Sequence, residues 1–180
     1  VMTNAAEIVR FWRDAGPKFW FVKDETSDGR CRAFENAHHA AARGELSAWE
    51  MDEEGTLALL ILLDQIPRNI FRKSPHAFAT DALAQAIALR ALDKQFDAAT
   101  DTDLRFLFYM PLEHAENLAL QERCVTLFTN LGDANYLKFA ALHRDIIARF
   151  GRFPHRNAIL GRKSTPEELA AGRKEFEDAG

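Results

Sequence analysis

The sequence predicts an all-α protein in which short antiparallel helix hairpins stack into one globular domain. Three observations favour this fold class. Nearly every segment repeats its apolar residues at intervals of three and four, which is the period of a helix. No segment shows the sustained alternation of apolar and polar residues that marks a half-buried strand. Glycine and proline fall between the periodic segments, so the helices are joined by short turns.

Composition and charge limit the class of protein. At 180 residues, 47% of them apolar, the chain can form a single core, and we expect one domain over residues 1–180. A net charge of −4 predicts no attraction to nucleic acid or to an acidic membrane surface. The longest apolar run, Leu57 to Leu63, is far shorter than the roughly 20 residues that span a bilayer, and no signal-peptide pattern is evident. Cys31 and Cys124 form no CxxC pair, which fits a reducing compartment, so we expect a cytoplasmic protein.

Two helices are expected before residue 50. The first runs from Asn4 to Arg13, and Gly16-Pro17 ends it. A polar turn at Ser27-Asp28-Gly29 precedes the second helix, Arg30 to Arg43, for which Gly44 is a natural C-cap.

The third helix is predicted to be the centre of the fold. Asp52 is its expected N-cap, followed by acidic residues in the first turn, where the helix dipole favours them. From Leu57 to Leu63 the helix is apolar on all sides, as a fully buried helix is. It turns polar over Asp64 to Asn69, and Pro67 stops or kinks it. A fourth helical region starts at Ser74-Pro75 and runs to about Lys94.

Four more helices are predicted in the second half of the chain. They run from Asp101 to Tyr109, from Pro111 to about Leu131, from Tyr136 to Phe150, and onward from a capping box at Thr165-Pro166-Glu167-Glu168. The last of them contains Leu169 and Phe176. The segment Phe150 to Asn157, FGRFPHRN, fits no helix or strand period and is predicted to be a loop.

The FGRFPHRN loop concentrates positive charge. Arg152, His155 and Arg156 are three potential cations beside two phenylalanines. Either the protein's own carboxylates or an anionic ligand must neutralise them. Arginine suits a partly dehydrated anion site, because its planar fork binds two oxygens at once.

Three helices of buried type also turn polar in places. The third helix gives way to Asp64 and Arg68, the helix after Pro111 begins with Glu113 and His114, and His143 lies on an apolar helix face. Because burying an unpaired charge costs several kcal/mol, these groups should meet each other or a ligand, and we expect them to converge with the loop. The candidate catalytic residues are Glu113, His114 and His143, and the candidate ligand-binding residues are Asp64, Arg68, Arg72, Glu116, Arg152, Phe153, His155, Arg156 and Asn157.

Each of these residues also has a purely structural interpretation. Asp64 with Arg68 at helical spacing fits a helix-end ion pair, and His143 fits a hydrogen-bonded core histidine. Glu113 and Glu116 suit a first helical turn whatever their function, and the loop arginines fit clamps on helix C-termini. The motifs HExxH, GxSxG, GxGxxG and the P-loop are absent from the sequence, so no reaction class is indicated.

Four stretches resemble a known family: LILLDQIPRNIFR (Leu60 to Arg72), AFATDALA (Ala77 to Ala84), FYMPLEHAE (Phe108 to Glu116) and HRDIIARFGRFPHRNAILGRKSTPEE (His143 to Glu168). They are similar to the bacterial family known as domain of unknown function 924, and the likeness extends over nearly the whole chain. The resemblance implies an all-helical fold related to right-handed, tetratricopeptide-like superhelices, and it implies no particular activity. The chain departs from the family at Leu169 to Gly172, where small residues and a glycine replace a more apolar finish.

Three functions fit these observations without a metal. The first is a pocket for a small anionic molecule that bears a carboxylate or a phosphate. The arginines of the third helix and of the loop hold the anion there, and Glu113 pairs with His114 or His143 for hydrolysis or proton transfer. The second is a helical scaffold that binds a peptide or a protein partner. The third is a closed ion-pair network that only fixes the order of the helices. We expect the first, with no cofactor and with neither nucleic acid nor membrane as a partner.

A metal site is the fourth and least favoured function. Glu113, His114 and Glu116, with a distant histidine, offer ligand types but lack a recognised ligand spacing, and no cysteine pair supports zinc. His38-His39 is interpreted as incidental, because it lies on a helix edge that looks exposed. The sequence therefore predicts no stoichiometric metal.

Overall fold

The structure is a computed structural model that describes residues 3–21 and 24–171. Every regular element within these residues is helical and none is a strand, which confirms the all-α fold class. No helix in the same two ranges is long and apolar enough to cross a membrane. The chain forms two compact units, Val1–Pro111 and Leu112–Gly180. The tetratricopeptide-like superhelix and the single domain stay predictions.

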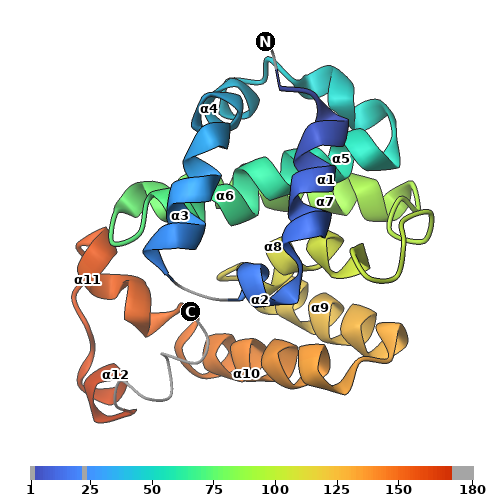
Figure 1. The fold of residues 1–180 in the computed structure, drawn as a ribbon. Helices are drawn as coiled ribbons and strands as arrows, with labels where there is room; N and C mark the ends of the chain where they lie inside the picture. Colours follow the sequence, from blue (N-terminus) through green and yellow to red (C-terminus); the bar gives the residue numbers. More distant parts are fainter. Residues whose placement is uncertain (1–2, 22–23, 172–180) are drawn as a thin grey trace. The chain divides into compact units, whose positions relative to one another are not determined.

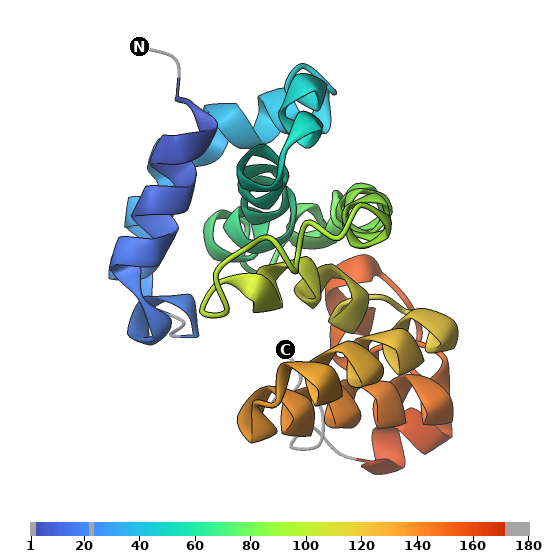
Figure 2. The ribbon, with the colours of Figure 1, turned by 90° about the vertical axis from the view of Figure 1, so that its right-hand side faces the viewer.

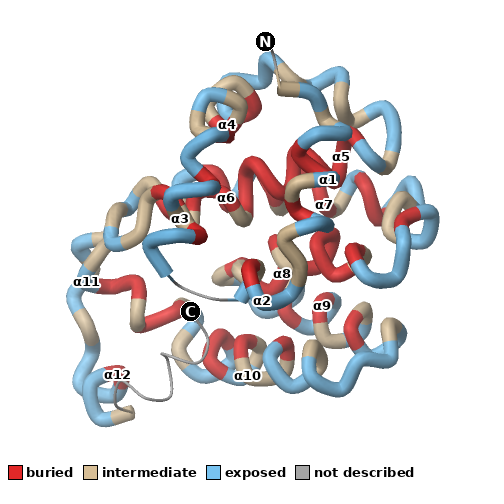
Figure 3. Tube along the Cα trace, viewed as in Figure 1, coloured by how far each residue is buried: buried red, intermediate tan, exposed pale blue. Residues whose placement is uncertain are grey.

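A buried helical rod forms the centre of the first unit. It consists of α5 (Glu53–Leu60), a π-helical turn η3 (Ile61–Gln65) and α6 (Ile66–Ile70). Each residue from Leu57 to Leu63 is at most 2% exposed, so the predicted central helix is confirmed (Figure 3). Asp52 caps the rod as predicted, because its carboxylate accepts a hydrogen bond of 2.7 Å from the Gly55 amide.

The other helices of the first unit surround this rod. α1 (Ala5–Ala15) and α7 (Asp81–Asp93) pack against α5, while α3 (Glu25–Cys31) packs against α6 and α4 (Glu35–Ala42) against the π turn (Figures 1 and 2). The turn η2 (Ser47–Met51) also packs on α5, at Gly55, where any Cβ would collide with the Trp49 carbonyl. The short elements are α2 (Pro17–Trp20), η1 (Arg32–Phe34), η4 (Pro75–Phe78) and η5 (Arg105–Phe108).

Several predictions for the first unit differ from the structure. The helix expected from Arg30 to Arg43 divides into the end of α3, η1 and α4. Ser27-Asp28-Gly29 lies inside α3 and is not a turn, because the Asp24 carboxylate starts a helix by accepting a hydrogen bond of 2.7 Å from the Ser27 amide. The helix expected over residues 101–109 is only the 3-10 turn η5, and the region 75–94 divides into η4 and α7. Pro67 stands in the first turn of α6, where a missing amide hydrogen is tolerated.

The second unit is built on two antiparallel helices, α9 (Leu118–Leu131) and α10 (Ala134–Phe150), which pack along each other (Figure 1). The turn between them is tight because Gly132 adopts a φ of 83° and Asp133 caps α10 at once. Ile146 and Ile147 of α10 form a small core with Phe153 of the loop.

The helix predicted from Pro111 to Leu131 is in fact two helices. α8 (Met110–Glu113) ends before residues 114–117, and α9 follows them. Asn117 caps α9 by accepting a hydrogen bond of 3.0 Å from the amide three residues on. Gln121 fills the break, because its Nε2 lies 2.7–3.3 Å from the carbonyl oxygens of Leu112, Glu113 and Ala115. A side chain thus supplies the donor that the interrupted backbone lacks.

The C-terminal helix α12 (Pro166–Ala171) begins with the predicted capping box. The Thr165 hydroxyl accepts from the Glu168 amide at 3.1 Å, and the Glu168 carboxylate accepts from the Thr165 amide at 2.8 Å. Leu169 belongs to this helix, whereas Phe176 lies outside the described residues. FGRFPHRN is only partly a loop, since Pro154–Arg156 forms the 3-10 turn η6 and Asn157 begins α11 (Asn157–Leu160).

Candidate functional site

The predicted site residues are divided between the two units. Asp64, Arg68 and Arg72 belong to the first unit, and the others belong to the second. The expectation that all of them line one region stays a prediction. Within each unit, the structure shows which of these side chains meet.

The π turn of the first unit is a place where side chains contact the backbone of the buried rod. Pro67 has no amide hydrogen, so it donates to neither of the carbonyls four and five residues earlier, those of Leu63 and Leu62. Side chains reach both carbonyls. The Thr80 hydroxyl donates to the Leu63 oxygen at 2.6 Å, and His38 Nδ1 lies 2.7 Å from the Leu62 oxygen. The polar groups that the proline leaves inside the core are therefore satisfied.

The predicted arginines of the first unit are held by carboxylates. Arg68 donates two hydrogen bonds to Asp81, at 2.7 and 2.9 Å, and its distance to the Asp64 carboxylate is longer, 3.6 Å. Arg72 makes two hydrogen bonds to Asp28, at 2.6 and 2.8 Å. The helix-end pair of Asp64 and Arg68 is thus present, but Asp81 is the principal partner. Sequence reasoning missed Asp28 because it placed that residue in a turn.

Arg152 of the loop is bound to the capping-box carboxylate. Its Nε and Nη2 donate to the two oxygens of Glu168 at 3.0 and 2.7 Å, and Nη2 also donates to the Lys163 carbonyl at 2.8 Å. These hydrogen bonds, opposed in part by burial, lower the pKa of the Glu168 carboxyl to about 2. Glu168 therefore both caps α12 and neutralises the loop.

Glu116 holds the other side of the loop. Its carboxylate accepts hydrogen bonds from Arg162 Nη1 at 2.9 and 3.1 Å and from the Phe153 amide at 2.8 Å. Arg156 approaches the same carboxylate at 3.8 Å and donates to the His114 carbonyl at 3.1 Å. Arg152 and Arg156 of the loop, and Arg162 after it, thus meet carboxylates of the same unit, which is the geometry that a structural network requires.

Asn157 connects the pair of Arg162 and Glu116 with the pair of Arg152 and Glu168. Its side-chain oxygen accepts from Arg162 Nε at 3.0 Å, and its Nδ2 lies 3.2 Å from Ser164 Oγ and 3.3 Å from a Glu168 oxygen. Sequence reasoning did not select Arg162 or Glu168. The signal for Arg162 was its place in the GRKST segment beside the loop, and Glu168 was already explained by the capping box.

A second kind of pair lies between α8 and α10. Glu113 and His143 are 4% and 5% exposed, and His143 Nε2 is 3.9 Å from Glu113 Oε2. His143 Nδ1 is 2.7 Å from the Phe139 carbonyl, which can only accept, so Nδ1 carries a hydrogen. Nε2 is therefore the nitrogen whose proton can exchange, and it faces the carboxylate. The structure brings these two predicted catalytic residues together.

Aromatic rings and a thiol surround this pair. The ring centroid of His143 is 5.6 Å from that of Phe153 and 6.5 Å from that of His114. The centroids of Phe153 and His155 are 5.7 Å apart. Burial, with the Glu113 charge, raises the pKa of the Cys124 thiol far above its ordinary value. Cys124 is thus an unreactive core residue and no nucleophile.

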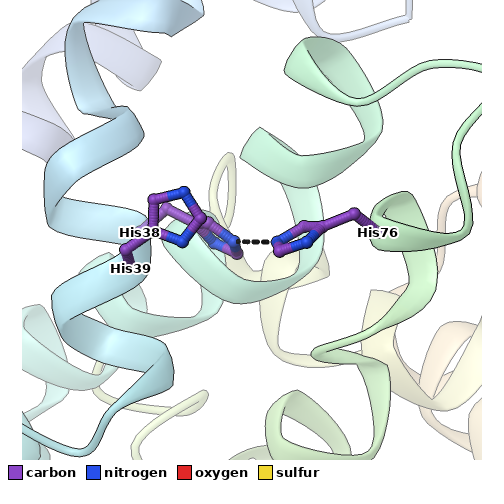
Figure 4. A group of neighbouring side chains, drawn as sticks. All are labelled: His38, His39 and His76. Atoms are coloured by element: carbon purple, nitrogen blue, oxygen red, sulfur yellow. Dashed lines mark hydrogen bonds between the residues drawn. The ribbon is translucent and has the colours of Figure 1, made fainter.

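Three histidines of the first unit form a cluster that sequence reasoning did not predict. One ligand nitrogen from each of His38, His39 and His76 lies within 4.8 Å of the others (Figure 4). The exposed helix edge expected for His38 is wrong, because its side chain is fully buried, and burial lowers its pKa. No local pattern indicated the third member, because His76 lies 38 residues after His38.

The fold and these clusters define an all-helical protein with buried polar groups and no motif that assigns a reaction. The chain belongs to the bacterial family described as "Bacterial protein of unknown function (DUF924)", which it matches over residues 8–173. It is also similar to the solved structure of a protein of unknown function from Agrobacterium tumefaciens. The two are 50% identical, with a TM-score of 0.90 over 93% of this chain and 95% of the other. No curated protein matches the chain.

Proposed function

We propose that the second unit binds a small molecule bearing a carboxylate or a phosphate, and that Glu113 and His143 exchange protons with it. The observation that carries this proposal is the pairing of a buried carboxylate with a buried imidazole, 3.9 Å apart. Ionisable groups removed from water in this way are more frequent at functional sites than elsewhere.

This pair differs from the arginine pairs of the same unit in what its protons can do. An arginine keeps its charge throughout the physiological range, so Arg152 and Glu168 have a single charge state there. A proton can pass between His143 Nε2 and the Glu113 carboxylate, so the two residues can form a charged pair or a neutral pair. A shift between these states at Nε2 is the property that a general acid–base pair needs, and it favours hydrolysis or proton transfer as the reaction class.

Glu116 supports a carboxylate or phosphate as the ligand's charged group. Its own carboxylate is bound by Arg162 and by the Phe153 amide, with Arg156 nearby, and its side chain is 23% exposed. Donors that hold one carboxylate can hold another, so a ligand anion would bind here by displacing Glu116. We therefore propose Arg156 and Arg162 as the anion contacts rather than Arg152, whose hydrogen bonds go to the less exposed Glu168.

A thermal-shift screen against phosphorylated and carboxylated metabolites tests the proposal. A ligand at 100 times its dissociation constant should stabilise the wild type by about 2.7 kcal/mol. His143→Gln and Arg162→Gln should each remove that shift. Arg144→Gln is the matched control, because Arg144 lies on α10 but pairs at the surface with Asp145 and Glu122, and it should keep the shift. A screen in which no anion stabilises the wild type would contradict the proposal.

The second candidate function is a helical scaffold for a peptide or a protein partner, in which the polar cluster of the second unit is structural. One observation favours it: Arg152 and Arg162 are each held by a carboxylate of the chain itself. In that case Arg152→Ala lowers the stability of the ligand-free protein by a few kcal/mol, and no anion restores it. In the anion-binding case the ligand-free variant loses similar stability, because Arg152 is held by the buried Glu168, but a carboxylate or phosphate ligand still stabilises the variant.

A further inference from the structure

The histidine cluster of the first unit joins two segments that are far apart in the sequence. His38 and His39 are neighbours on α4, and His76 comes from η4. Figure 4 shows the imidazole of His76 pointing at His38, with His39 beside them. Nε2 of His38 and Nε2 of His76 are 3.1 Å apart, and the third imidazole has a nitrogen within 4.8 Å of both.

The backbone of the π turn fixes the orientation and the tautomer of His38. Its Nδ1 is 2.7 Å from the Leu62 carbonyl, and a carbonyl oxygen only accepts hydrogen bonds, so Nδ1 carries the hydrogen. The lone pair of the neutral ring is then on Nε2, directed at His76. Metal-bound histidines in proteins are held in the same way, with the outer ring nitrogen donating to a backbone carbonyl or a carboxylate. Because Pro67 has no amide hydrogen to donate to the Leu62 carbonyl, that carbonyl is available to His38 and orients its ring.

The spacing of the nitrogens matches what a metal ion requires. Zinc binds histidine nitrogen at about 2.0–2.1 Å, so two nitrogens on one tetrahedral ion stand about 3.3 Å apart. The 3.1 Å separation between His38 and His76 is close to this value. A nitrogen of His39 lies within 4.8 Å of the other two, so the His39 ring has to move closer to reach the same ion.

The surroundings hold the rings and leave a path to solvent. The Phe71 ring contacts His76 in a tilted arrangement, with centroids 4.1 Å apart, and its centroid is 5.7 and 5.9 Å from those of His38 and His39. The Glu35 carboxylate lies 3.8 Å from His39 Nε2 and adds negative charge beside the cluster. His38 is fully buried, whereas His39 and His76 are partly exposed, so an ion can enter and keep one position for water.

We propose that His38, His39 and His76 form a binding site for one divalent transition-metal ion of the zinc class. Three imidazoles suit Zn²⁺, Co²⁺, Ni²⁺ or Cu²⁺, whereas Mg²⁺ and Ca²⁺ prefer oxygen ligands. Three protein ligands with an open fourth position are the arrangement of exchangeable or catalytic zinc, and closed structural sites use four. This inference is independent of the anion site of the second unit, and it replaces the expectation from sequence that the protein holds no metal.

The test uses the full chain with any polyhistidine tag removed. The protein is stripped with EDTA, dialysed and titrated with Zn²⁺ by calorimetry, and Co²⁺ is added separately to record visible absorption bands. We expect one ion per chain, and Co²⁺ bands that indicate nitrogen coordination. His39→Gln and His76→Gln should each weaken Zn²⁺ binding by at least about tenfold, because each removes a ligand. Zn²⁺ should compete with Co²⁺, and Mg²⁺ should not.

Controls keep this result interpretable. His155→Gln removes a histidine of the second unit and should leave Zn²⁺ affinity unchanged. His39 and His76 are chosen over the buried His38, whose loss also removes a hydrogen bond to the core, and circular dichroism confirms that the variants fold. Failure of the untagged wild type to bind stoichiometric Zn²⁺ would overturn the proposal. Binding that survives in both His39→Gln and His76→Gln would overturn it as well.

Discussion

The loop of the second unit and the histidine cluster of the first both gather nitrogen-bearing side chains, but they are completed in different ways. Arg152 and Arg162 each face a carboxylate, in hydrogen bonds of 2.7–3.1 Å. In the histidine cluster the two closest groups are both imidazoles, whose facing nitrogens are 3.1 Å apart. In the loop, each of these arginine charges is neutralised by a carboxylate of the chain itself. The two imidazoles can share one hydrogen bond, or both can turn a lone pair to a cation, which a histidine nitrogen binds well.

This difference predicts which residues stabilise the fold without a ligand and which do so only when a ligand is bound. We call the ion pairs and hydrogen bonds around the loop the loop network; its members are Glu116, Arg152, Arg156, Asn157, Arg162 and Glu168. These residues should contribute to the free energy of unfolding whether or not a ligand is present, because their partners belong to the chain. The cluster members His39 and His76 should contribute mainly when a metal is bound, since binding to the folded state alone adds stability by mass action.

Loss of the Glu116 carboxylate should have the largest effect on stability. Glu116→Ala leaves Arg162 Nη1 and the Phe153 amide without their acceptor and removes the only carboxylate among the described residues that is shown to pair with Arg162, which costs about 3 kcal/mol for a partly buried charge. Urea denaturation measures the change. Glu122→Ala is the control, because its carboxylate is 56% exposed and meets Arg144 at 3.4 Å, so it should cost about 0–1 kcal/mol. Equal losses in the two variants would contradict the loop network.

Glu168→Gln should cost about 2 kcal/mol at neutral pH, and the cost should depend on pH. The pKa of Glu168 is lowered from 4.5 to about 2 in the folded protein. Its stabilising contribution is therefore complete above about pH 4.5 and is lost as the pH falls towards 2. Unfolding measured at pH 7 and pH 2.5 should show the wild type and the variant converging at low pH. A difference that stays constant would contradict the role of the Glu168 charge, and Glu167→Gln, an exposed neighbour, serves as the control.

Thr80→Val should cost about 1–2 kcal/mol, because it leaves the buried Leu63 carbonyl without its 2.6 Å hydrogen bond. Pro67 cannot supply a replacement donor. Thr129→Val removes a similar bond on the exposed face of α9 and should cost less than about 0.5 kcal/mol. Thermal unfolding of the two variants makes the comparison. A neutral Thr80→Val would show that the π turn does not depend on side-chain donors.

His76→Gln should have the smallest effect when metal is absent. The glutamine amide can donate to His38 Nε2, and the site is partly exposed, so the loss should stay below about 1 kcal/mol in EDTA. Chemical denaturation in EDTA gives this value. A loss of several kcal/mol without metal would make the cluster a structural element like the loop network.

The sequence predicted the helices because their signals are local. The apolar run of Leu57 to Leu63, the Asp52 cap and the Thr165 capping box depend on residues within a few positions, and the structure confirms each. The break after Glu113 was missed because a polar side chain, that of Gln121, replaces backbone donors, and periodicity does not reveal such a substitution.

The partners in the sites could not be predicted in the same way. Arg72 and Asp28 are 44 residues apart, and His38 and His76 are 38 apart. Packing alone decides which distant segments meet, so the sequence indicated that Arg152 needs an anion without identifying Glu168. Glu113 was predicted to pair with His114 or His143, because these residues interrupt apolar helix faces, and the structure places His143 Nε2 3.9 Å from its carboxylate.

The contrast between the two units is tested most directly by the effect of Zn²⁺ on the unfolding of three untagged proteins: the wild type, Glu168→Gln and His76→Gln. At 100 times the wild-type dissociation constant, Zn²⁺ should stabilise the wild type and Glu168→Gln alike by about 2.7 kcal/mol, although Glu168→Gln starts from lower stability. His76→Gln should stay near its metal-free stability. Equal stabilisation of all three proteins, or of none, would contradict the assignment of metal binding to the histidine cluster.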